Sequence, residues 1–212
     1  MSIGSGGAMP GVPRPGSPQG SQEVQGGQLS SKAAKVFLVG MPGTGKSSVA
    51  PLLAPRLGWG YVDSDAQIEK VSGLSIPGFF ARHGEQAFRI QEARCIKWVS
   101  GLSDPLIVAV GGGAVLDLES RILMKENGII IWFRAALDTL VARLSSQVAT
   151  RPLIGEGDIR SNLKNLEAVR APLYQEIATL TIDVDDGDID KVTDRVLRAL
   201  GRVGKWQGAS GR

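Results

Sequence analysis

The chain has 212 residues, of which 42% are apolar and 21% charged, with a net charge of +3. This length suits one domain with a sizeable core, and no stretch approaches 18 consecutive apolar residues, so no membrane span is expected. The modest charge, without a dense Lys/Arg block, gives no sign of a nucleic-acid surface. The single cysteine, Cys95, cannot form an internal disulfide, which favours a reducing compartment and predicts a cytoplasmic location.

Both ends of the chain differ from its middle. Residues 1–34 are dominated by Gly, Pro, Ser and Gln and contain almost no large apolar side chain. Such a segment cannot bury enough surface to offset its ordering entropy, so we predict a disordered tail. It has no apolar run typical of a secretory signal, and only Arg14 and Lys32 are basic. A natural tail, a weak organelle-targeting segment and a remnant of cloning all stay open. Residues 201–212 predict a second loose tail.

Between the tails, short apolar runs alternate with longer amphipathic segments. The runs predict strands at 35–39, 61–63, 106–110, 129–133 and 180–184. The amphipathic segments predict helices at 46–57, 65–71, 85–101, 117–126, 135–145, 160–177 and 188–200, the last with Ile189, Val192, Val196 and Leu200 on one face. The almost continuously apolar strands indicate a sheet covered on both faces. The pattern therefore predicts a three-layer α/β/α sandwich whose ligands bind beyond the carboxyl ends of parallel strands.

The clearest motif, GMPGTGKSS at residues 40–48, directly follows the first predicted strand. It fits G-x-x-x-x-G-K-[ST], with a strand before it and a helix after it. Its glycines let backbone N–H groups turn toward phosphate oxygens, and the following helix points its positive end at the same anion. The motif predicts a nucleoside triphosphate site formed by Gly43, Thr44, Gly45, Lys46, Ser47 and Ser48. Lys46 would reach the β- and γ-phosphates, and the Ser47 hydroxyl would bind Mg²⁺.

Two prolines stand inside the helix predicted after this motif. Pro51 falls early enough to be tolerated, whereas Pro55 should kink or end the helix.

A pair of carboxylates ends the second predicted strand, in YVDSDAQIE at residues 61–69. Asp63 and Asp65 stand one residue apart and reach the same edge of the sheet as the phosphate motif. A kinase needs one carboxylate near Mg²⁺ and another near the acceptor hydroxyl. Capping of a helix by Asp63 or Ser64 is the simpler alternative, and it is compatible with such a function.

Four further motifs follow in order: HGEQAFR, VGGGAV, RPLI and RAPLY. Taken together with the first two, they resemble the shikimate kinase family, small P-loop kinases that phosphorylate the 3-hydroxyl of shikimate with MgATP in aromatic amino acid biosynthesis. The resemblance covers about residues 35–200. It implies a five-stranded parallel sheet of order 2-3-1-4-5, a mobile lid at about residues 146–160 and a monomer.

The resemblance also implies a role for each motif. Asp63 would face the Mg²⁺ ion, and Asp65 would face the acceptor hydroxyls as an orienting group or base. The rest of the acceptor site would comprise Arg89 and Arg170 on the substrate carboxylate, the turn of Gly111, Gly112 and Gly113, and an apolar wall of Phe80 and Phe88. Glu85, which lies four residues before Arg89, would hold that arginine. A surface ion pair, a structural turn and solvated helix charges are the alternatives for these residues.

On the nucleotide side, the resemblance implies that Arg151, in the lid, stabilises the transferring phosphoryl group and that Arg143 stacks on the adenine. The loop after the last strand, DVDDGDID, departs from the family because it has neither a proline nor an arginine to face the base. A weaker contact with the base is therefore expected.

Two other functions stay open. One is a different small-molecule P-loop kinase, of the gluconate or nucleoside monophosphate type. The other is a kinase-like binding module without turnover. Arginines that converge with Asp65 favour an acceptor with both a carboxylate and hydroxyls. An inactive module would be expected to lack one of the residues for phosphate, metal or substrate, all of which are present.

Overall fold

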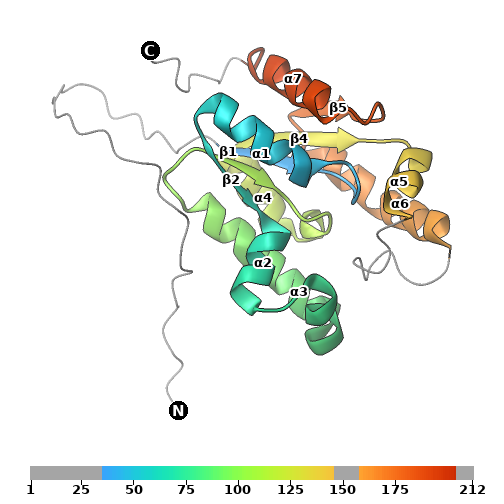
Figure 1. The fold of residues 1–212 in the computed structure, drawn as a ribbon. Coiled ribbons are helices and arrows are strands. Elements are labelled where there is room, and N and C mark those ends of the chain that lie inside the picture. Colours follow the sequence, from blue (N-terminus) through green and yellow to red (C-terminus); the bar gives the residue numbers. More distant parts are fainter. Residues whose placement is uncertain (1–34, 146–157, 204–212) are drawn as a thin grey trace. The chain divides into compact units, whose positions relative to one another are not determined.

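The computed structural model describes residues 35–145 and 158–203. Five strands form one sheet of order β2-β3-β1-β4-β5, in which all paired neighbours are parallel (Figure 1). The strands are β1 (Lys35–Val39), β2 (Gly60–Asp63), β3 (Leu106–Ala109), β4 (Gly128–Arg134) and β5 (Leu180–Asp183). The predicted strand order is confirmed, and each predicted strand end agrees with the structure to within one residue.

Helices cover both faces of the sheet, as Figure 1 shows. On one face α1 (Lys46–Leu57) packs against α7 (Ile189–Leu200), and on the other lie α3 (Ile76–Ser100), α4 (Leu118–Asn127) and α6 (Ile159–Ile177). The shorter elements are α2 (Ser64–Ser72), the 3₁₀ helix η1 (Ala114–Leu116) and α5 (Leu137–Leu144). This arrangement is the predicted three-layer sandwich. No helix in the described ranges is long and apolar enough to cross a membrane.

The central strands carry the core because both of their faces are covered. Every residue of β1 and of β3 is buried. These buried residues include the charged Lys35 at the start of β1. Its Nζ donates to the carbonyls of Leu102 and Asp104, at 2.9 Å each. Burial lowers the pKa of this lysine, although Asp104 opposes the change. The lysine thus connects the loop before β3 to the start of β1, at the edge of the sheet opposite the carboxyl ends of the strands.

The structure corrects the expected effect of the prolines in α1. The helix runs through Pro51 and Pro55 and ends only at Leu57, where Gly58 adopts φ 68°. Pro55 lies in the last turn, where its missing N–H removes one helical bond, and the neighbouring Leu53 is fully buried. Packing on the core therefore outweighs the local cost of the proline.

The prediction for α3 is wrong at its start. We predicted a helix over residues 85–101, whereas helical structure begins at Ile76 and is interrupted only at Gly84, where φ is 77° and ψ is 174°. Ser75 caps the first turn by accepting from the N–H of Gly78, at 3.2 Å. Pro77 and Gly78 in this first turn obscure the helical pattern in the sequence. Packing of Phe79 against Phe88, with ring centroids 6.0 Å apart, stabilises the helical segment.

The predicted lid at about residues 146–160 lies almost wholly outside the described residues. Only residues 158–160 of the predicted lid are described. Asp158 caps α6 by accepting from the N–H groups of Arg160 and Ser161, and the helix begins at Ile159. The predicted tails at 1–34 and 201–212 also lie outside the described residues, apart from positions 201–203.

Candidate active site

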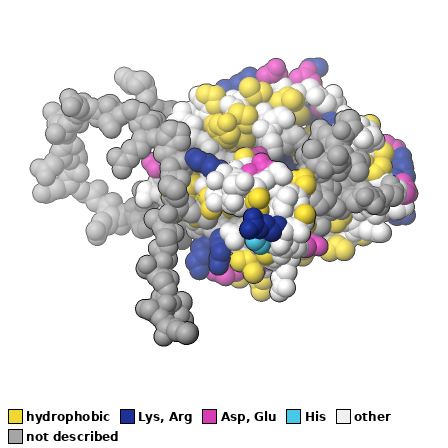
Figure 2. All heavy atoms as spheres, turned by 60° about the horizontal axis from the view of Figure 1, so that its bottom comes forward, with side chains coloured by type: hydrophobic (Ala, Val, Ile, Leu, Met, Phe, Trp, Pro, Cys, Tyr) yellow, Lys and Arg dark blue, Asp and Glu magenta, His cyan; other side chains and the backbone are white. Residues whose placement is uncertain are grey.

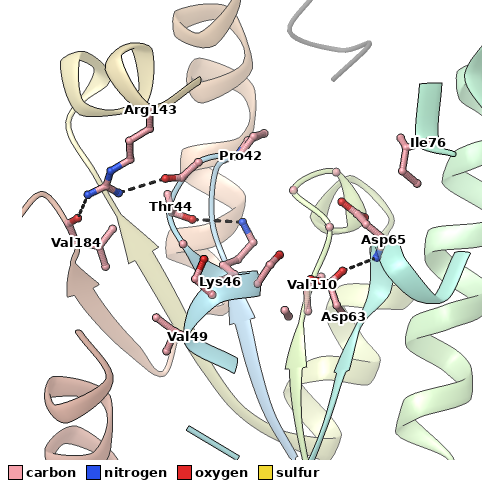
Figure 3. A pocket seen from close by; sticks show the side chains of 18 of the residues that line it. Pro42, Thr44, Lys46, Val49, Asp63, Asp65, Ile76, Val110, Arg143 and Val184 are labelled. Carbon is pink, nitrogen blue, oxygen red and sulfur yellow. Dashed lines mark hydrogen bonds between the residues drawn. The ribbon is translucent and has the colours of Figure 1, made fainter. Parts of the chain in front are cut away.

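A cleft of about 390 Å³ opens at the carboxyl ends of the strands (Figure 3). It is lined by most of the residues that the sequence singles out: Gly43, Thr44, Gly45, Lys46, Ser47, Ser48, Asp63, Asp65, Phe80, Phe88, Arg89, Gly111, Gly112, Gly113 and Arg143. Segments far apart in the chain therefore meet in one place, as expected at the ligand-binding edge of a parallel sheet. Arg151 lies outside the described residues.

The phosphate motif forms the loop between β1 and α1. Gly43 and Gly45 have φ values of 81° and 87°, a conformation that side chains other than glycine rarely adopt. The buried Lys46 bends back over this loop, where its Nζ donates to the carbonyls of Gly40 and Met41 at 2.8 and 2.9 Å. These contacts hold the ammonium group at the mouth of the loop, where a phosphate would bind.

The DSD segment combines a structural and a functional position. Asp63 caps α2, because its Oδ1 accepts from the N–H groups of Asp65 and Ala66 at 3.0 and 3.2 Å. Ser64 is buried, and its hydroxyl accepts from the N–H of Gly111 at 2.7 Å. The capping role considered for Asp63 is therefore confirmed, and both carboxylates still line the cleft.

Arg89 is held by two carboxylates of its own helix. Its Nε and Nη2 donate to Oε1 of Glu85 at 3.2 and 2.7 Å, as predicted, and its Nη1 donates to Glu92. Glu92 is only 2% exposed, and burial raises its pKa to about 7, even though Arg89 acts to lower it. The sequence analysis missed Glu92. Its position three residues after Arg89 was the available signal, but spacing alone does not reveal burial.

The glycine turn after β3 leaves no room for side chains. A Cβ atom on Gly111 would lie 2.5 Å from Oε1 of Glu92 and 2.7 Å from Oδ1 of Asp65. A Cβ atom on Gly113 would overlap the guanidinium group of Arg89. Gly111 and Gly113 must be glycine because the side chains of Glu92, Asp65 and Arg89 pack directly on their backbone.

Arg170 reaches this turn from α6, although it does not line the cleft itself. It is 3% exposed, and burial lowers the pKa of its guanidinium group. The guanidinium group hydrogen-bonds the hydroxyl of the fully buried Tyr174, which in turn donates to the carbonyl of Gly112 at 2.6 Å. Tyr174 belongs to the RAPLY motif, but nothing in that motif indicates this contact.

Arg143 closes the other end of the cleft. Its Nη1 donates to the carbonyl of Gly43 at 3.2 Å, and its Nη2 donates to the carbonyl of Val184 at 2.6 Å (Figure 3). It thus connects the phosphate loop with the loop after β5.

On α7, Val192 is buried as predicted, whereas Ile189, predicted for the same buried face, is 40% exposed and lines the cleft.

The cleft also offers ligands for a magnesium ion. Ser47 is exposed on the first turn of α1, and Asp63 faces the same space, so two hard oxygen donors are available. The described residues contain no cluster of three or more His, Cys, Asp or Glu side chains suited to a metal. These residues therefore fit Mg²⁺ that takes its other ligands from phosphate oxygens and water.

The single histidine of the chain, His83, takes no part in this cleft. Figure 2 shows it at the surface, and its ring packs on Phe79 with centroids 4.8 Å apart. The described residues that line the cleft include three carboxylates, Asp63, Asp65 and Glu92, but no histidine.

Comparisons with known proteins now identify the family. The shikimate kinase family model matches residues 42–201. The chain is 40% identical over 166 residues to the shikimate kinase of Ruegeria pomeroyi, covering 78% of this chain and 84% of that protein. For the shikimate kinase of Synechococcus sp. (strain CC9605), the identity is 41% over 165 residues, covering 78% and 81%. The chain belongs to the shikimate kinase family.

Solved structures agree with this family. The shikimate kinase from Acinetobacter baumannii, in complex with shikimate, matches with a TM-score of 0.76 and 29% identity, covering 81% of this chain and 96% of that chain. A gluconokinase from Sinorhizobium meliloti matches with a TM-score of 0.54 and 17% identity, covering 81% and 94%. The gluconokinase shares the fold only, whereas the shikimate kinases share both sequence and fold.

Proposed function

We propose that the cleft transfers the γ-phosphoryl group of MgATP to the 3-hydroxyl of shikimate, giving shikimate 3-phosphate and ADP. Family membership makes the chain an ATP-dependent shikimate kinase, and the residue roles below are our proposal. The observation that supports them best is the meeting, in one cleft, of a phosphate-binding loop with Arg89, Asp65 and the glycine turn.

In the acceptor half, Arg89 binds the substrate carboxylate from the cleft, and Arg170, buried next to Gly112, adds a second positive charge beside it. A guanidinium group matches a planar carboxylate with paired hydrogen bonds, and burial of both arginines strengthens that attraction. Phe80 and Phe88, with ring centroids 4.7 Å apart, form the apolar wall beside the ring of the substrate. Asp65 accepts the hydrogen bond of the reacting hydroxyl and orients its oxygen toward the γ-phosphorus.

In the nucleotide half, Lys46 gives up its hydrogen bonds to the loop carbonyls and donates to the β- and γ-phosphates instead. Ser47 and Asp63 would hold Mg²⁺, which would offset charge on the phosphate oxygens. As the acceptor oxygen bonds to the γ-phosphorus, the bond to the β–γ bridging oxygen breaks, and the hydroxyl proton passes to Asp65. We assign Arg143 to the base. Arg151, outside the described residues, is proposed to stabilise charge on the transferring group. The enzyme is proposed to act as a cytoplasmic monomer.

A coupled assay of ADP release tests the acceptor. Shikimate, quinate, gluconate and nucleoside monophosphates are compared at equal concentrations with MgATP. We expect turnover with shikimate to exceed that with every other acceptor, because nucleoside monophosphates lack a carboxylate, gluconate lacks a ring, and quinate lacks the ring double bond of shikimate. Equal or faster turnover with another acceptor would refute the assignment.

Asp63→Asn and Asp65→Asn test the division between the two carboxylates. Asparagine also caps helices, so Asp63→Asn keeps the start of α2 and removes only the charge. We expect this variant to need more Mg²⁺ for half-maximal rate. Asp65→Asn should lower kcat by about 10²- to 10⁴-fold, the usual contribution of a general base, without changing the Mg²⁺ requirement. Identical defects in both variants would show that the division is wrong.

A further inference from the structure

The acidic loop after β5 borders the cleft through Val184 and Gly187. Each of its aspartates at 183, 185, 186 and 188 accepts a hydrogen bond. Asp183 pairs with Arg134, Asp186 pairs with Arg195, and Asp188 caps α7. Asp185 differs from these three, because its partners lie at the start of α5, the helix that carries Arg143.

Asp185 supplies the cap that α5 lacks. The N-cap residue of this helix is Ala136, whose side chain cannot accept a hydrogen bond. Oδ1 of Asp185 accepts from the N–H of Ala136 at 2.8 Å and from the hydroxyl of Thr139 at 2.6 Å. A carboxylate at this position satisfies an end N–H group and opposes the positive end of the helix.

The far end of α5 is tied to the same loop. Nη2 of Arg143 donates to the carbonyl of Val184 at 2.6 Å and to that of Asp185 at 3.5 Å. The loop is therefore fastened at both ends of this short helix. Gly187, with φ 69°, turns the loop beside the guanidinium group, since a Cβ atom there would lie 3.6 Å from Nη2 of Arg143. Both Arg143 and Gly187 line the cleft.

We infer that Asp185 is a positioning residue for the nucleotide base. By fastening the loop to α5, it fixes Gly187 and Ile189 relative to the guanidinium group of Arg143, at the end of the cleft where the base is proposed to bind. The inference deepens the proposed function, on which the placement of the base at Arg143 rests.

Isothermal titration with ADP and with inorganic tripolyphosphate tests this role, because only ADP carries a base. Asp185→Ala should weaken ADP binding by about five- to tenfold, the range expected for two partly exposed hydrogen bonds. Tripolyphosphate binding should not change, since the phosphate loop makes no contact with this carboxylate. Asp185→Asn keeps an acceptor oxygen and should bind ADP within about twofold of the wild type.

Asp186→Ala is the matched control. It removes the same charge from the same loop, but its carboxylate pairs with Arg195 on α7, so ADP affinity should be unchanged. Thr139→Val should cause part of the loss, and combining it with Asp185→Ala should add nothing further. Unchanged ADP binding in Asp185→Ala, an equal loss in Asp186→Ala, or a parallel loss of tripolyphosphate binding would overturn the inference. None of these titrations contains an acceptor, so failure of the shikimate assignment would be seen separately.

Discussion

Glu92 shows at the scale of single residues how burial shapes the acceptor half of the cleft. It is almost wholly enclosed, and it contacts Arg89 where the glycine turn leaves no room for a side chain. Loss of hydration raises its pKa from 4.5 to about 7. An ionised Glu92 is therefore tolerated because Arg89 is beside it, and the pair holds the guanidinium group of Arg89 at the cleft.

This raised pKa predicts how stability depends on pH. Between the unfolded and folded pKa values, the folded state binds more protons than the unfolded state, so the contribution of Glu92 to stability falls as pH rises. Glu92→Gln cannot ionise and lacks this dependence. We expect the unfolding free energy of the wild type, relative to Glu92→Gln, to fall between about pH 5 and about pH 8. Urea unfolding at both pH values measures it, and a constant difference would contradict the prediction.

A second prediction concerns the hydroxyl group of Tyr174. Its hydroxyl joins Arg170 to the carbonyl of Gly112, so Tyr174→Phe removes this link and leaves the ring packed against Trp132. We expect KM for shikimate to rise about three- to tenfold, as for one buried hydrogen bond, with KM for ATP unchanged. Tyr61→Phe, at the only other tyrosine and half exposed, is the control. An equal rise in both KM values would indicate a general loss of structure.

At the scale of elements, the junction between α4 and β4 shows how closely strands β1 and β4 approach. Gly128 pairs with Lys35, and a methyl group on Gly128 would collide with the backbone carbonyl of Lys35. Backbone atoms within a sheet cannot move aside without loss of hydrogen bonds. Gly128→Ala should therefore lower the unfolding free energy by about 2 kcal/mol, within the usual range for overpacking, with little effect on either KM.

Denaturant unfolding of this variant measures the effect. Gly101→Ala is a suitable control, because Gly101 has φ −84° and its nearest neighbour would lie 3.5 Å from the added methyl group. A loss of stability in Gly101→Ala as large as in Gly128→Ala would show that the collision with Lys35 is not the cause.

At the scale of the whole molecule, the cleft has two halves built from different segments. The phosphate loop and Arg143 form one half, whereas α3 and the glycine turn form the other, and α6 contacts that turn through Tyr174. Each ligand should therefore stabilise the fold independently. A ligand at 100 times its Kd adds about 2.7 kcal/mol, which for a domain of this size raises Tm by roughly 5 to 10 °C.

Arg89→Ala should separate these halves in a thermal-shift measurement. We expect ADP to raise Tm in this variant as it does in the wild type, and shikimate to raise Tm only in the wild type. If the variant also lost the shift with ADP, the assignment of Arg89 to the acceptor alone would be wrong.

The sheet, the phosphate motif and most residues of the cleft could be predicted from the sequence alone. Those features depend on short spacings, on strand periodicity and on strand ends that meet at one edge. The burial of Glu92, the contact of Tyr174 with Gly112 and the capping of α5 by Asp185 became apparent only in the folded protein. Tyr174 and Asp185 act on residues 62 and 49 positions away, and the burial of Glu92 depends on neighbours from other segments. Such contacts arise from the packing of distant segments, which leaves no periodic trace in the chain.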